Sequence, residues 1–223
     1  MAEAFSARNS EGPSPGVETK ALQVATGAVE GIGATAIEVV ANSLGTGGIH
    51  IGEFSDSFTR AISNLESISS AYTEPTSSLI ASSSYDPQGH STLSTALNSL
   101  WNCIGSGMLR KGGTVTLVCE CRNGIGSGAL QRYVEGRSAD DLTKCSYIDG
   151  LEHLVYLNDI KQKFELSLVS ALPKYYTSGK LGFARYSSMK EVVSACMAKH
   201  GKSHKSVVIS DPDITIISTK PSA

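Results

Sequence analysis

The sequence lacks several features that would assign the protein to a specialised class. No apolar run approaches the roughly 20 residues of a membrane-spanning helix, and the N-terminus lacks the apolar segment of a secretory signal. With a formal net charge of −2 over 223 residues, neither a basic nucleic-acid surface nor an acidic tail is indicated. The sequence therefore predicts a globular cytoplasmic protein with no membrane and no nucleic-acid partner.

Cysteine is present, but not in the pattern of a disulfide framework. The five cysteines are an odd number with irregular spacing. Cys119 and Cys121 are separated by one residue, whereas about two to four residues usually separate the two members of a zinc pair. On a strand these two side chains would face the same side. We expect mostly buried, reduced thiols, and a metal or redox pair at Cys119 and Cys121 remains the alternative.

The length suits one large domain behind a short tail. Residues 1–17 are small and polar and include two prolines, so they are predicted to be a disordered tail. Residues 18–223 are ample for a hydrophobic core and are predicted to form a single α/β domain. Within it we distinguish an N-terminal extension over residues 18–75 and a core over residues 76–218.

The extension is predicted to contain a helix, a β-hairpin and a second helix. Apolar residues recur at helical spacing over residues 18–31. Two β-branched, apolar segments, 34–44 and 49–54, are predicted to be strands joined tightly through the glycine-rich residues 45–48. Ser55 or Asp56 is expected to cap a helix that continues through Ser70.

From residue 76 onward, short apolar strands alternate with helices. This alternation is typical of βαβ units, whose crossovers build a parallel sheet covered by helices on both faces. The predicted fold class is α/β, with helices on both faces of a mostly parallel (mixed), Rossmann-like sheet after a β-hairpin/helix extension. Strands are predicted over residues 78–82, 114–119, 165–170, 206–209 and 214–218, and helices from Ser91 or Thr92, around Leu130 to Val134, and over 147–164 and 189–197.

The loops at the carboxyl ends of these strands are expected to meet at one crevice. They comprise residues 83–91, 120–128 and 171–179. The glycine loop 124–128 connects a strand to a helix, where α/β proteins place anionic ligands. Two interpretations remain open: the glycines permit a tight turn, or their N–H groups bind a carboxylate or phosphate, with Arg122 adding a charge-assisted contact.

The candidate site residues come from all three of these loops. His90 is the candidate general base, and an exposed loop histidine without a role is the alternative. Lys174 and Tyr175, with their neighbours, could contact an acidic ligand or a partner, or form a solvated helix face. The candidate ligand-binding residues are Tyr85, Gln88, Arg122, Asn123, Gly124, Gly126, Ser127 and Gly128.

A family resemblance rests on three groups of segments that keep one order and spacing. These are LIASSSYDP over residues 79–87, GGTVTLVCECRNGIG over 112–126, and VSALP, KLGF, SMKE and HGK between residues 169 and 202. Together they resemble the C-terminal region of the nickel-pincer-dependent lactate racemase family, over roughly residues 45–218. The second segment is the most specific. The resemblance implies an α/β fold and a small hydroxy-acid-like ligand.

The resemblance does not extend to the catalytic equipment that the family implies. Full-length members have an N-terminal domain with a histidine-rich motif, two proton-transferring histidines and a lysine-tethered nickel pincer cofactor. None of the five histidines here lies in such a motif, and no lysine has the matching glycine-rich context. Pro87 is followed by Gln88 and Gly89, so the cation expected for a substrate carboxylate is missing. Leu93 to Thr95 replace the family's tyrosine and glutamine.

The sequence leaves three functions open, and whether the protein is an enzyme is open with them. The first is a divergent racemase-like domain without independent racemase activity, which binds a small anionic ligand or acts as a regulatory module. The second is a subunit of a split nickel-dependent 2-hydroxy-acid racemase or epimerase. The third is a protein–protein interaction module. No intrinsic cofactor or metal is expected, so nickel would come with a partner chain; a small carboxylate or a second copy of this chain is the other expected partner.

Overall fold

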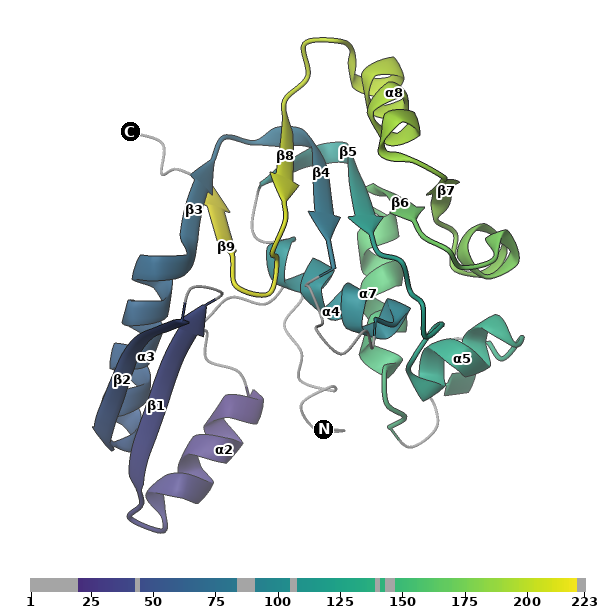
Figure 1. The fold of residues 1–223 in the computed structure, drawn as a ribbon. Helices are drawn as coiled ribbons and strands as arrows, with labels where there is room; N and C mark the ends of the chain where they lie inside the picture. The colour runs from purple at the N-terminus through teal and green to yellow at the C-terminus, as the bar shows by residue number, and fades with distance from the viewer. Residues whose placement is uncertain are drawn as a thin grey trace.

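The computed structural model describes residues 20–42, 45–83, 91–104, 108–138, 141–142 and 147–219. Within these ranges, the centre is a five-stranded sheet with the order β7-β6-β5-β4-β8, and every neighbouring pair is parallel (Figure 1). The predicted α/β class is confirmed. The strands are β4 (Thr76–Ser82), β5 (Leu109–Val118), β6 (Glu165–Val169), β7 (Ala184–Tyr186) and β8 (Ser206–Ile209).

Helices cover both faces of this sheet, as predicted. Alternate side chains of a strand point to opposite faces, and here they enter two different clusters. Leu79 and Leu168 belong to the large core, which α4 (Leu93–Cys103), α5 (Gly128–Val134) and α7 (Leu151–Lys161) complete. On the opposite face Ile80 packs against Val192 and Cys196 of α8 (Met189–His200).

On the sheet face that α8 covers, hydroxyl groups of the strands form hydrogen bonds with polar partners. Thr116 and Ser167 share a buried hydrogen bond of 2.6 Å between neighbouring strands. Thr114 Oγ1 lies 2.9 Å from His200 Nε2 at the end of α8. Buried polar groups are tolerated when they are paired in this way.

The N-terminal extension forms its own layer of strand and helix (Figure 1). Strand β1 (Thr35–Asn42) pairs antiparallel with β2 (Gly45–Glu53), and α3 (Phe54–Ser69) packs against both. Helix α2 (Lys20–Glu30) precedes the hairpin. The predicted β-hairpin/helix extension is therefore present. The predicted tail, residues 1–17, lies outside the described residues, and the proposed domain boundaries stay a prediction.

The glycines between the two predicted strands belong to β2 rather than to the connection. A Cβ on Gly47 would lie 2.5 Å from Ile68 Cδ1, and a Cβ on Gly48 would lie 2.4 Å from Asn64 Oδ1. Helix α3 lies so close that the side chains of Ile68 and Asn64 would have to move to make room for a side chain at either position. These glycines therefore serve the packing of α3 on the hairpin, which a turn-based interpretation of the sequence misses.

The cap of α3 also differs from the prediction. Glu53 is the N-cap residue, and its carboxylate accepts a 3.3 Å hydrogen bond from the Asp56 backbone N–H. The predicted caps, Ser55 and Asp56, lie inside the first turn. An acidic side chain at a helix start also interacts favourably with the helix dipole.

A second strand pair connects the extension to the core. Strand β3 (Ser70–Thr73) runs parallel to β9 (Ile216–Thr219) outside the main sheet. Ile217 of β9 is buried in the large core cluster. The final segment of the described chain thus joins the N-terminal layer to the central sheet.

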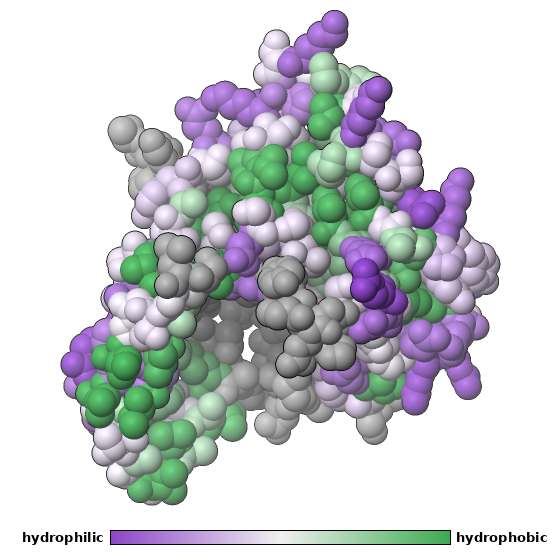
Figure 2. Space-filling view, viewed as in Figure 1, coloured by the Kyte–Doolittle hydropathy of each residue, from purple (hydrophilic) through white to green (hydrophobic). Residues whose placement is uncertain are grey.

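The outer face of the hairpin is apolar and exposed. Figure 2 shows apolar residues gathered over β1, β2 and α2 at the lower left of the molecule. The side chains concerned are Ile37, Val39, Ile49 and Ile51, each at least 58% exposed. Within the described ranges, no helix combines the length and apolarity needed to cross a membrane.

Candidate functional site

A shallow hollow lies at the carboxyl ends of β4, β5 and β6. It has a volume of about 390 Å³. Each of the three loops expected to meet there contributes at least one residue near its start: Ser83, Glu120 and Ala171. The lining residues are Ser83, Val118, Cys119, Glu120, Val169, Ser170, Ala171 and Ser187.

Two arginines lie beside the hollow. Arg122 Nη2 lies 3.2 Å from Glu120 Oε1, and both side chains are well exposed, at 68% and 60%. Arg185 Nη2 donates a 3.3 Å hydrogen bond to the backbone oxygen of Ser170. Guanidinium groups bind carboxylates through two parallel hydrogen bonds, so this edge carries the cation type suited to a small acid.

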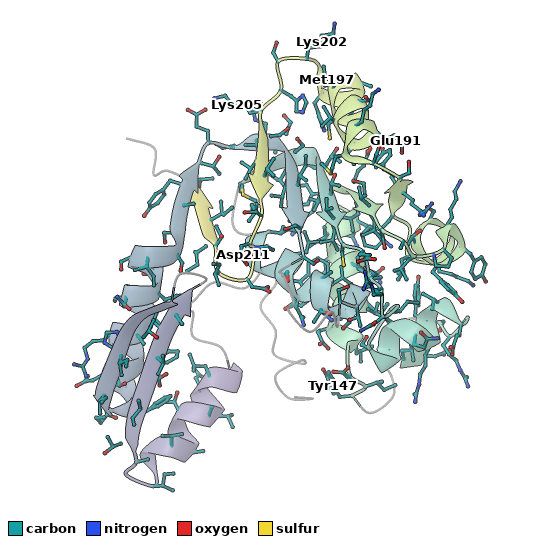
Figure 3. The ribbon with its side chains drawn as sticks, viewed as in Figure 1. Tyr147, Glu191, Met197, Lys202, Lys205 and Asp211 are labelled. Carbon is teal, nitrogen blue, oxygen red and sulfur yellow. The ribbon has the colours of Figure 1, made fainter. Side chains whose placement is uncertain are left out.

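Helix α8 begins beside the hollow, because Ser187, which lines the hollow, lies just before its N-cap Ser188. Glu191 in the first turn of this helix is labelled in Figure 3. The Ser187 N–H and hydroxyl donate hydrogen bonds of 2.8 Å and 2.6 Å to the Glu191 carboxylate. These bonds lower the pKa of Glu191. Ser188 caps the helix by accepting from the Glu191 N–H. The helix start is therefore already provided with an anion from its own chain.

The glycine loop after β5 is bound to the start of α4. The Gly124 oxygen accepts a 3.0 Å hydrogen bond from the Leu93 N–H, and the Ile125 oxygen accepts a 2.9 Å bond from the Ser94 N–H. The first N–H groups of a helix have no partner within the helix. The loop supplies carbonyl oxygens to two of them, which gives it a structural role.

The remaining residues of the loop also have local contacts. Gly126 has φ +95°, and a Cβ there would lie 2.6 Å from Thr92 Oγ1, so only glycine fits this contact. Ser127 is the N-cap of α5 and accepts a hydrogen bond from the Leu130 N–H. Gly128 begins that helix. Both observations support the tight-turn interpretation of the glycines.

The predicted ligand-binding residues are therefore only partly brought to the hollow. Arg122 reaches it through Glu120, whereas Asn123, Gly124, Gly126, Ser127 and Gly128 are not among its lining residues. Tyr85, Gln88 and His90 lie outside the described residues. Their roles as ligand contacts or general base remain predictions.

His153 is a buried polar residue to which the sequence assigned no role. Trp101 Nε1 donates a 2.9 Å hydrogen bond to His153 Nδ1, and His153 Nε2 lies 3.1 Å from Ser94 Oγ. Because Nδ1 accepts, the proton of the neutral ring is on Nε2, which donates to Ser94. Burial lowers the pKa of His153. The ring therefore joins α4 to α7 and does not activate Ser94 as a nucleophile.

Cys119 and Cys121 are brought together in a way that the strand pattern does not describe. Strand β5 ends at Val118, and both cysteines follow it in the turn. Cys121 has φ +53°, the one positive φ of a non-glycine residue within the described part of the chain. The two Sγ atoms lie 3.1 Å apart, and both residues are buried.

The described residues do not fit a nickel centre. Among them, no three side chains of histidine, cysteine, aspartate or glutamate are grouped as metal ligands would be. His153 is engaged by Trp101, and His200 lies beside Thr114 at the opposite edge of the sheet. We therefore derive no chemical step through a metal.

Comparison of the structure with solved structures shows what it resembles. The lactate racemase apoprotein from Thermoanaerobacterium thermosaccharolyticum superposes with a TM-score of 0.70 over 83% of this chain, at 15% sequence identity. The two chains share a fold. A Thermotoga maritima protein solved by a structural genomics consortium gives a TM-score of 0.62 over 92% of this chain, at 13% identity.

The likeness to the lactate racemase apoprotein establishes the fold and nothing finer. This chain covers 46% of the lactate racemase chain and 55% of the Thermotoga maritima chain, so it spans about half the length of each. No protein-family model matches the sequence, and no curated protein does. The lactate-racemase-like α/β fold is thus supported by structure at low sequence identity.

Proposed function

We propose that this protein is a divergent lactate-racemase-like domain that binds a small anionic ligand, of the hydroxy-acid class, at the carboxyl edge of its sheet. It would not racemise that ligand by itself. The observation that carries the proposal is the hollow at the ends of β4, β5 and β6, with the exposed Arg122–Glu120 pair beside it. Ligands of open α/β sheets bind outside the carboxyl ends of the strands.

The proposed binding step is an exchange of carboxylates on Arg122. An exposed ion pair contributes only about 0–1 kcal/mol, so releasing Glu120 costs little. The ligand carboxylate then binds the guanidinium of Arg122 in place of the Glu120 carboxylate. The Ser83 hydroxyl lines the hollow and is hydrogen-bonded to Cys119. Its oxygen retains acceptor capacity for the hydroxyl of the ligand.

The proposed lack of independent racemisation rests on the chemistry that racemisation requires. Inverting a 2-hydroxy acid needs a group that removes and returns hydrogen, together with an acid–base pair. Among the described histidines, His50 lies in β2 of the hairpin, His153 is buried in a hydrogen-bonded network, and the tilted rings of His200 and His204 lie 5.8 Å apart near the end of α8. These positions favour binding without catalysis.

Calorimetric titration with D- and L-lactate tests the proposal. Arg122→Gln is expected to weaken binding by up to about fivefold, because an ion pair on an exposed guanidinium contributes at most about 1 kcal/mol. Glu120→Gln is expected to tighten binding, because it removes the competing carboxylate. Arg110→Gln, at an exposed position toward the opposite end of β5, is the matched control and should bind as the unaltered protein does.

Two results would overturn the proposal. One is unchanged affinity in Arg122→Gln, and the other is no heat of binding across a panel of hydroxy and keto acids. Gly126 is unsuitable for this test, because a side chain there collides with Thr92. A Gly126 variant would lose the loop conformation whether or not a ligand binds.

A second candidate function is favoured by the exposed apolar face of the hairpin. Ile37 and Ile49 are each at least 60% exposed, and a contiguous apolar face of this kind is typical of an interaction surface. Such a face supports contact with a second chain, as a subunit of a split racemase would make. Native purification with metal analysis tests it: a nickel-bearing partner chain would support a split enzyme.

A further inference from the structure

We propose that Cys119 and Cys121 form a redox-active dithiol that undergoes thiol–disulfide exchange with small disulfides entering the hollow at the sheet edge. The proposal does not depend on the proposed ligand function. It rests on the geometry of the turn that follows β5. That turn directs two thiols toward each other at the border of the hollow.

The two sulfur atoms are already in contact. The Cys121 thiol donates a 3.1 Å hydrogen bond to Cys119 Sγ. The left-handed backbone of Cys121, with φ +53°, is uncommon for a residue with a side chain. The conformation places its thiol beside that of Cys119, so the pair can form an intramolecular disulfide with little movement.

The two cysteines have different positions, which assigns their roles. Cys119 lines the hollow and Cys121 does not, so an incoming disulfide meets Cys119 first. Hydrogen bonds from Cys121 and Ser83 also lower the pKa of Cys119 to about 7, whereas the pKa of Cys121 is raised by its bond to Cys119. A thiolate is the nucleophile in exchange, so Cys119 attacks and Cys121 resolves.

The exchange proceeds in two balanced steps. The Cys119 thiolate attacks one sulfur of a small disulfide, the S–S bond breaks, and one thiolate leaves and takes up a proton. Cys121 then loses its proton and attacks Cys119 Sγ in the mixed disulfide, which releases the second small thiol. The protein dithiol loses two electrons, and the small disulfide is reduced to two thiols.

The spacing argues for a reversible role rather than a structural one. A disulfide stabilises a fold mainly by closing a loop of the unfolded chain, and the effect is smaller for shorter loops. Only Glu120 lies between these cysteines, so a bond here would add little stability. A zinc site is not favoured either, because no third ligand joins the pair among the described residues.

Equilibration with oxidised glutathione, followed by trypsin digestion and mass spectrometry, tests the proposal. Lys111 and Arg122 bracket one tryptic peptide that contains both cysteines. In the unaltered protein this peptide is expected to lose two hydrogens and to retain no glutathione. Cys121→Ser is expected to accumulate one glutathione on Cys119, since nothing resolves the mixed disulfide. Cys119→Ser is expected to react at least about tenfold more slowly, because Cys121 does not line the hollow and burial still raises the pKa of its thiol.

Cys196→Ser is the matched control and should behave as the unaltered protein. Cys196 lies in α8, and its side chain packs with Val192 against Ile80 on the sheet, away from Cys119 and Cys121. Circular dichroism establishes that each variant is folded. The proposal is overturned if the bracketed peptide keeps both free thiols in excess oxidised glutathione. It is equally overturned if folded Cys121→Ser gains no glutathione, or if Cys119 is found linked to a cysteine other than Cys121.

Discussion

At the residue scale, the polar group with the clearest consequence is the imidazole of His153. It is 1% exposed, and burial outweighs the opposing influence of Glu152 and Asp149, so the pKa of His153 is lowered. The unfolded chain therefore binds a proton at a pH where the folded protein does not. Stability should fall as the pH decreases below about 6.5, the usual value for histidine.

The measurement is urea unfolding of the unaltered protein and His153→Gln at about pH 7.5, 6.5 and 5.5, on either side of the usual histidine pKa. The stability advantage of the unaltered protein is expected to shrink by up to about 1.4 kcal/mol per pH unit below 6.5. Taking the difference between the two proteins removes the contributions of Glu191 and His200. A difference that is constant with pH would contradict the buried, neutral assignment.

The sequence predicts the burial of a single residue correctly where hydrophobicity alone determines whether the side chain is buried. Trp101 follows Leu93, Leu97 and Leu100 at helical spacing, a pattern that predicts a core position, and it is 6% exposed. His153 was not singled out, although it stands beside Leu154 in an otherwise apolar helical stripe. A histidine in such a stripe is buried only if a partner is available, and Trp101 is 52 positions away in the chain.

At the element scale, α4 begins with a reciprocal cap. The Thr92 Oγ1 accepts from the Thr95 N–H at 3.2 Å, and Thr95 Oγ1 accepts from the Thr92 N–H at 3.1 Å. Thr92→Val keeps the shape but removes the hydroxyl, so it is expected to cost about 1 kcal/mol of stability in urea unfolding. Thr92→Ser retains the hydroxyl and should lose much less. Equal losses in both variants would show that the cap contributes nothing.

Elements with strong local patterns were predicted well, whereas those that depend on distant partners were not. The strand expected over 206–209 and the helix expected over 189–197 correspond to β8 and α8. Strands β3 and β7 were missed, because four-residue and three-residue strands carry little periodicity of their own. The segment after Pro173 is a π-helix, Tyr175–Lys180, a form that no simple periodicity indicates.

At the scale of the whole molecule, β9 holds the N-terminal layer to the sheet. Ile217 is 8% exposed and packs in the large core, while β9 is also the partner of β3. Ile217→Ala is expected to cost about 2–4 kcal/mol and to reduce hydrogen-exchange protection in Ser70–Thr73. Val208→Ala, at a position 70% exposed, is the matched control and should change stability by no more than about 0.5 kcal/mol.

A result in which Ile217→Ala destabilises the protein but leaves β3 protected would place the link between the layers elsewhere. Exchange measured by mass spectrometry on the unaltered protein provides the reference. The comparison separates a local effect on the core from loss of the strand pair, because only the latter exposes the β3 amides.

The sequence by itself determined the class of the fold, because the periodicity of apolar residues and the glycines that mark turns are local properties of each segment. It also located the sheet edge at which the hollow lies, because parallel strands share one carboxyl edge. Only the tertiary structure decided what the residues at that edge do. The Gly124 oxygen meets the Leu93 N–H, and Cys121 turns back onto Cys119. Such contacts depend on how the chain bends and on which distant segments come together. The local sequence pattern of a single segment predicts neither.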